Sequence, residues 1–170
     1  YSNPAPIEMG LKFRSDIQGY VTGVRFFKAT GTTGGHIGRL WTTDGIKLAE
    51  VTFSNETDSG WQSAAFPAPV LIQADTTYII SNYAFDGNHR FSLSQNYFTS
   101  SGVDNTPLHA LAEGVDGHNG VYSDTGGFFN QANMSSNYWV DLIFDTTPPP
   151  PDTIPPTITS VFPSRNAAEV

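Results

Sequence analysis

The sequence predicts an all-β fold: an antiparallel β-sandwich or jelly-roll-like single domain with a proline-rich C-terminal extension. Three observations predict it. Only 14% of the 170 residues are charged while 13% are aromatic, and glycine and proline are frequent, which is typical of short strands joined by turns. Short runs of β-branched and aromatic residues recur between turn signals. We find no stretch of about ten residues with the apolar spacing of an amphipathic helix.

The expected strands follow one another along most of the chain. Met9, Leu11 and Phe13 alternate with polar residues, as in a half-buried strand. Gly23 interrupts the β-rich segment 20–28 and marks a candidate bulge. The dipeptide Asp44-Gly45 predicts a hairpin. Further strands are expected at residues 37–42, 48–53, 61–66, 70–72, 76–83 and 137–144.

The chain divides into three parts by composition. Residues 1–145 are expected to form the sandwich, within which the glycine-rich segment 94–133 is long enough to be a functional or mobile loop. Residues 146–156 hold a run of four prolines and predict an extended linker. Residues 157–170 contain an isolated strand, which either begins a further domain or docks on another surface. Because the chain starts at Tyr1, we interpret it as a piece of a longer product.

Charge and cysteine content exclude several functions. The net charge is −8, and lysine and arginine total only 8. Nucleic-acid binding depends on such residues neutralising phosphates, so we expect no nucleic-acid partner. No apolar run approaches the roughly 20 residues of a membrane span, so we expect no membrane insertion. Cysteine is absent, which excludes disulfides and a thiol nucleophile.

The familiar catalytic motifs are also absent. The sequence has no Gly-x-Ser-x-Gly elbow, no His-Glu-x-x-His, no P-loop and no Rossmann glycine pattern. The four histidines show no ligand spacing, and His36, next to Gly34-Gly35, is interpreted as a turn residue. We therefore expect a protein that is not an enzyme. A hydrolase or lyase with a cleft in segment 94–133 stays open as an alternative, since a catalytic triad can assemble from distant residues.

One structural Ca²⁺ is predicted, because calcium prefers several hard oxygen ligands. The candidate ligands are Glu8, before the first strand, and Asp141, in the last one. The first and last strands of a sandwich are often neighbours, which would bring these carboxylates together. The alternative is that one of them forms an ion pair with Arg14 or Arg25.

Carbohydrate binding requires aromatic faces for the apolar side of a sugar ring and polar groups for its hydroxyls. Aromatic residues in loops are the best candidates, although such rings also cap the ends of sandwich cores. The tryptophans Trp41, Trp61 and Trp139 fall in or beside strands and are expected in the core or at its edge. The predicted ligand-binding residues are Tyr83, Phe85, Asn88, His89, Tyr97, Phe128, Phe129 and Asn130.

Several segments together resemble the DUF4082 domain over roughly residues 5–145. The motifs are each weak but specific in combination. They are Gly-Leu-Lys-Phe-Arg-Ser at 10–15, Val-Thr-Gly-Val-Arg-Phe-Phe-Lys at 21–28, His-Ile-Gly-Arg-Leu-Trp at 36–41, Phe-Ser-Asn-Glu-Thr-Asp-Ser-Gly-Trp-Gln at 53–62 and Asn-Tyr-Trp-Val-Asp-Leu-Ile-Phe at 137–144.

The resemblance implies a β-sandwich module of large secreted bacterial proteins, in which such modules sit beside Ig-like, fibronectin-like and carbohydrate-active domains. The tail 152–170 resembles the first strand of a bacterial Ig-like domain. We therefore expect an extracellular or cell-surface accessory module that binds a polysaccharide or a cell-surface glycan. The alternative is a structural or adhesive subunit of an extracellular fibre, assembled by docking residues 157–163 on a neighbouring copy.

Overall fold

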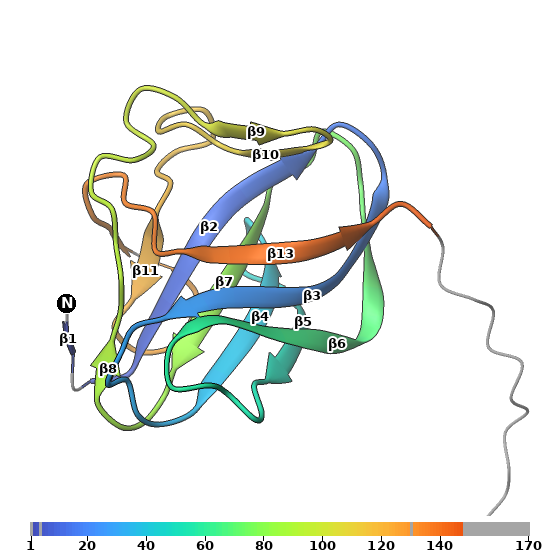
Figure 1. The fold of residues 1–170 in the computed structure, drawn as a ribbon. Helices are drawn as coiled ribbons and strands as arrows, with labels where there is room; N and C mark the ends of the chain where they lie inside the picture. The colour runs from blue at the N-terminus through green and yellow to red at the C-terminus, as the bar shows by residue number, and fades with distance from the viewer. Residues whose placement is uncertain (1, 4, 130, 148–170) are drawn as a thin grey trace, which may run out of the picture.

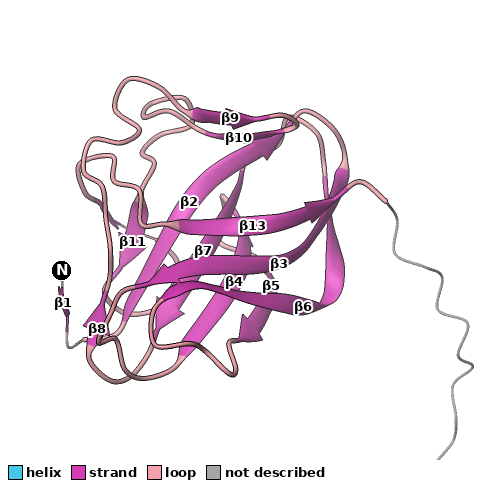
Figure 2. Cartoon of the chain, viewed as in Figure 1, coloured by secondary structure: helices cyan, strands magenta, loops and turns pink. Residues whose placement is uncertain are grey.

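The computed structural model describes residues 2–3, 5–129 and 131–147 (Figure 1). In this part of the chain there are strands, turns and loops but no α-helix, and hence no helix that could span a membrane (Figure 2). All paired strands are antiparallel, which confirms the predicted fold class. The strands are β1 (Ser2–Asn3), β2 (Ile7–Ser15), β3 (Gly19–Lys28), β4 (His36–Thr42), β5 (Lys47–Thr52), β6 (Gly60–Ile72), β7 (Tyr78–Ala84), β8 (His89–Arg90), β9 (Val103–Asn105), β10 (Leu108–Ala110), β11 (Val121–Ser123), β12 (Gln131–Ala132) and β13 (Val140–Asp145).

Two sheets face each other and form a sandwich. The larger sheet has the order β12-β11-β2-β7-β4-β5, with β10 on β2 and β9 on β10. Strand β11 pairs with residues 8–10 of β2 and β10 pairs with residues 13–15, so both lie along one edge of β2. The smaller sheet has the order β13-β3-β6. Its strands run across those of the larger sheet in front of it (Figure 1).

The core fills the space between the sheets and follows the two-residue period of the strands. On β3, Val24 and Phe26 point inward while Arg25 and Phe27 are exposed. On β4, Leu40 is completely buried and packs in the same cluster. Burying a side chain of this size stabilises the fold by about 1.5–3 kcal/mol. The rest of the central cluster is Leu11, Phe13, Val21, Phe53, Phe66, Ile72, Tyr78, Ile80, Phe98, Val140 and Leu142.

Two predicted strands are one. Residues 61–66 and 70–72 both belong to β6, which continues through Pro67 and Pro69. Because β6 is an edge strand, these prolines interrupt few ladder hydrogen bonds. The pairing of β3 shifts register beside Gly23 on both sides. Against β13 the extra residue is Thr22 on β3, next to the bulge predicted at Gly23, whereas against β6 the extra residues lie on β6. The hairpin predicted at Asp44-Gly45 joins β4 to β5.

The glycine-rich segment contains the four short strands β9 to β12, and part of it covers the outer face of the larger sheet. There Phe129 packs against Trp41, Ile79 and Val121. The ring approaches so closely that a Cβ on Gly10 would lie 2.9 Å from it. The outer face is therefore partly a second, smaller core.

Candidate ligand-binding groove

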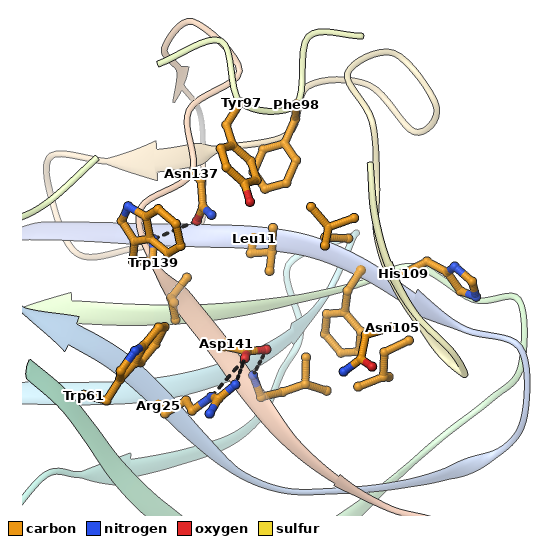
Figure 3. Close-up of a pocket in the computed structure, with 16 residues that line it drawn as sticks. Leu11, Arg25, Trp61, Tyr97, Phe98, Asn105, His109, Asn137, Trp139 and Asp141 are labelled. Carbon is orange, nitrogen blue, oxygen red and sulfur yellow. Dashed lines mark hydrogen bonds and ion pairs between the residues drawn. The ribbon is translucent and has the colours of Figure 1, made fainter. Parts of the chain in front are cut away.

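A groove of about 300 Å³ opens where β13 of the smaller sheet faces the β9–β10 hairpin (Figure 3). Its floor is the edge of the core, formed by Leu11 and Phe13 of β2 and by Val140 and Leu142 of β13. The hairpin supplies one wall, which includes Leu108. An apolar hollow bordered by a few polar groups is the usual form of a ligand site.

Three large aromatic side chains line this groove. Trp61 of β6 is 46% exposed and Tyr97 is 40% exposed, while Trp139 is half-buried. The rings of Tyr97 and Trp139 meet edge to face with their centroids 5.7 Å apart. Figure 3 places Trp61 and Trp139 on the same side of the groove, with Tyr97 above it. The site therefore offers a set of rings to an apolar ligand surface.

The backbone of Trp139 is strained. Its φ is +56°, in the left-handed region that bulky residues rarely adopt. Two hydrogen bonds hold it there: its N–H donates to Oδ1 of Asn137 at 2.8 Å, and its carbonyl accepts the N–H of Phe27 at 2.9 Å. Such strain, which costs on the order of 1–3 kcal/mol, clusters at functional sites. Here it sets the position of the Trp139 ring immediately before β13 begins.

An ion pair crosses the groove's border. Arg25 of β3 lies directly opposite Asp141 of β13 in the sheet register. Its Nε and Nη2 atoms both donate to Oδ2 of Asp141, the Nε contact at 2.9 Å. The guanidinium also lies over the Trp61 ring, 5.0 Å from its centroid. The three strands of the smaller sheet thus present a carboxylate, a cation and an aromatic face side by side.

The hairpin wall carries a histidine between two carboxylates. His109 of β10 contacts Asp104 through Nδ1 at 2.7 Å and Asp16 through Nε2 at 2.9 Å. The hydrogen bond to Asp104, together with the Asp16 carboxylate, raises the pKa of His109 above its ordinary value. These two contacts tie the hairpin to the turn after β2.

The predicted binding residues do not form one site. Among those that the structure describes, only Tyr97 lines the groove. Tyr83 lies on the outer face of the larger sheet beneath the Arg39 guanidinium, which is 4.5 Å from its ring centroid. Phe128 is 38% exposed and, like Phe129, contacts the Trp41 ring on that same face.

The other predicted residues lie at or near the β8 end of the sandwich or outside the described part. Phe85 is half-buried and lies beside Tyr83, whereas Asn88 is exposed. His89 was wrongly expected at the surface: it is 1% exposed because its ring inserts between the sheets. Asn130 lies outside the described residues.

The two predicted calcium ligands lie in different sheets. Glu8 is in β2, whose neighbours are β7, β10 and β11, whereas Asp141 is in β13, which pairs with β3. The expectation that their strands are neighbours was therefore wrong. Glu8 is fully buried and bonded to Arg39 and Ser81. Asp141 forms the expected alternative, an ion pair with Arg25.

This arrangement does not fit a shared metal ion. Each carboxylate already has a cation as its partner, and the described residues contain no group of three or more His, Cys, Asp or Glu side chains placed to hold a metal. Binding of a structural Ca²⁺ by this protein stays a prediction, without Glu8 and Asp141 as shared ligands.

A buried ionic network lies at the far end of β3 and β4. Lys28 Nζ is 2.9 Å from Glu56 Oε2, and His36 Nδ1 is 2.9 Å from Glu56 Oε1. His36 is the first residue of β4 and is 2% exposed, so its interpretation as a turn residue was wrong. Burial lowers the pKa of His36, with Glu56 acting in the opposite direction. The network is enclosed, and we interpret it as structural.

Trp61 and Trp139 were expected in the core or at its edge and were not among the predicted binding residues, yet both line the groove. The two-residue period of the strand could have identified the outward position of Trp61. Gln62 and Phe66 point inward on β6, so the period of two turns Trp61 outward. On β13 the same period places Asp141 on the opposite face of the strand from the buried Val140 and Leu142.

The comparisons with known proteins bear on identity alone. The family model described as "Domain of unknown function (DUF4082)" matches residues 1–140. No curated protein and no solved structure matches the chain. The matched region includes β1 to β12 and the first residue of β13, and with it nearly all of the groove. The chain belongs to the DUF4082 family.

Proposed function

We propose that this protein is a non-catalytic, extracellular accessory module that binds a carbohydrate polymer in the groove between β13 and the β9–β10 hairpin. The observation that carries the proposal is the set of rings Trp61, Tyr97 and Trp139 around one apolar hollow that also holds a polar ion pair. Aromatic faces suit the apolar side of a pyranose ring, and the ion pair suits its hydroxyls.

The form of the groove supports a polymer more than a small cofactor. It is open, and two of its rings are about two-fifths or more exposed, so a ligand would stay partly in solvent. A site of this kind binds each sugar weakly. Useful affinity then comes from repeated contacts along a polymer or from several modules in one protein.

Affinity electrophoresis of the full 170-residue chain in gels containing soluble polysaccharides tests the proposal. We expect retardation by at least one polymer, weakened about tenfold or more by Trp61→Ala, as for an energetically dominant aromatic contact. Ile46→Ala is the control, because Ile46 is 58% exposed in the β4–β5 turn, outside the groove. If Phe128→Ala weakened binding about tenfold and Trp61→Ala left it unchanged, the ligand would bind on the outer face of the larger sheet instead.

The fibre alternative depends on residues 157–163, which lie outside the described residues. It predicts that the chain assembles as its concentration rises. Light scattering across a concentration series checks this: a constant monomer mass contradicts the fibre and leaves the binding proposal intact.

A further inference from the structure

The ion pair in the groove has hydrogen-bonding capacity left over. Arg25 carries five N–H donors, and its hydrogen bonds to the described residues use two of them, both to Oδ2 of Asp141. Oδ1 of Asp141 accepts the backbone N–H of Leu142 at 2.8 Å. The side chains of Arg25 and Asp141 are 47% and 34% exposed. The pair therefore presents donors and an acceptor side by side at the groove.

Such a pair matches two neighbouring hydroxyls. A hydroxyl both donates and accepts, so one can accept from the guanidinium while the next donates to the carboxylate. Trp61 borders the same groove and is 46% exposed, with the guanidinium over one side of its ring. The side that the guanidinium does not cover is the one left for the apolar face of the same sugar. Hydrogen bonds to charged groups are stronger than neutral ones and depend on geometry, which gives the pair the means to select a ligand.

The charges around the groove disfavour an acidic ligand. Among the described lining residues, Arg25 and His109 are the two that can carry a positive charge. Each already faces carboxylate: Arg25 faces Asp141, and His109 faces both Asp104 and Asp16. The side chains of Asp104 and Asp16 are 79% and 50% exposed. A uronate or a sulfated sugar would thus meet like charge and no unpaired cation.

We propose that the groove selects neutral pyranoses, with the Arg25–Asp141 pair as the specificity determinant that binds two adjacent hydroxyls. This rests on the proposed function. It assigns a ligand class, neutral hexose polymers, and excludes acidic polysaccharides.

Affinity electrophoresis with a panel of neutral β-glucan, neutral galactomannan, alginate and polygalacturonate tests the proposal. The wild-type chain is expected to be retarded by a neutral polymer and not by the acidic ones. Retardation should be little changed by added salt, because a neutral ligand has no charge to screen.

The sharpest variant is Asp141→Asn, which keeps the shape and leaves Arg25 as an unpaired cation. It should weaken binding of the neutral polymer about tenfold, as for a lost hydrogen bond to a charged group, and should create binding to alginate. Asp145→Asn is the matched control. It makes the same charge change on the same strand, outside the groove. Circular dichroism of both variants checks that they fold. Arg25→Met is the second test: it should weaken binding of the neutral polymer without creating binding to the acidic polymers.

The outcomes separate this inference from the proposed function. Wild-type binding to acidic polymers, or unchanged selectivity in Asp141→Asn, overturns the ligand class while sugar binding stands. A chain that binds no polymer in the panel, with Trp61 intact, overturns both.

Discussion

Glu8 and Arg39 form a buried ion pair on the outer face of the larger sheet. Arg39 Nη1 contacts Oε2 of Glu8, and its Nε contacts the exposed Glu50 at 3.2 Å. Ser81 donates to the other Glu8 oxygen, and Trp41 donates to Ser81 at 2.9 Å. Glu8 is 0% exposed. Despite these partners, burial raises the pKa of Glu8 to about 7.

This raised pKa predicts a pH dependence of stability. A carboxyl whose pKa is about 7 when folded and 4.5 when unfolded binds a proton more tightly in the folded state. Its contribution is fully present below pH 4.5 and is lost as the pH rises to about 7. In Glu8→Gln this contribution disappears. Denaturant titrations give the free energy of unfolding of wild type and variant at pH 5 and at pH 8. The difference between the two proteins should be larger at pH 5 than at pH 8 by up to about 3 kcal/mol. Identical differences would contradict the assignment.

The buried network at the far end should depend on its carboxylate. In Glu56→Ala, Lys28 is left as an unpaired cation that is only 10% exposed, which costs about 3–5 kcal/mol. Urea denaturation measures the loss. Glu50→Ala is the comparison, because Glu50 is 44% exposed in its pair with Lys47 and should cost about 1 kcal/mol or less. A similar cost for both would show that burial of the network matters little.

His89 should be a source of acid sensitivity. Burial lowers its pKa, with the nearby charge of His36 acting in the same direction. Its two ring nitrogens have no hydrogen-bond partner among the described residues. Because the unfolded chain binds this proton more tightly, stability is lost as the pH falls below about 6.5. His89→Leu should raise the melting temperature relative to wild type more at pH 5 than at pH 7.5. An equal gain at the two pH values would contradict this role of His89.

Gly38 of the larger sheet lies very close to Val24 of the smaller sheet, so that an added methyl group tests how tightly the two sheets pack. A Cβ there would lie 2.0 Å from Cγ1 of the core residue Val24. Gly38→Ala should therefore destabilise the fold by about 1–3 kcal/mol through overpacking. Gly127→Ala is the control, because its nearest neighbour, Oγ1 of Thr125, is 3.8 Å away. Thermal melts of the two variants compare them directly, and equal melting temperatures would contradict the close packing.

The fold class follows from local patterns, and the pairing of strands does not. Alternation at Met9, Leu11 and Phe13 identifies an inward face of β2, because side chains alternate along any strand. It says nothing about which strand lies beside it. The sequence therefore predicts neither that β2 pairs with β7 nor that β13 pairs with β3. The incorrect placement of Glu8 beside Asp141 has this cause.

The groove was missed because all three tryptophans were assigned to the core or its edge on the ground that they lie in or beside strands. Trp41 is 7% exposed and Trp61 is 46% exposed, although both lie in strands. Strict use of the two-residue period identifies the outward position of Trp61. The same period places Arg25 on the outward face of β3, next to the inward-facing Val24. The position of Trp139 could not be found in this way, because it depends on a left-handed backbone held by Asn137.

The smaller sheet also has a consequence for how the protein is made. Strand β3 is completed by β13, and the Arg25–Asp141 pair joins residues 116 positions apart. Pairings between such distant segments form slowly, since the loop must close before the contact stabilises it. During synthesis, β3 is translated long before its partner, at about 5–20 residues per second. The edge of β3 that pairs with β13 therefore stays uncovered until the last strand is made.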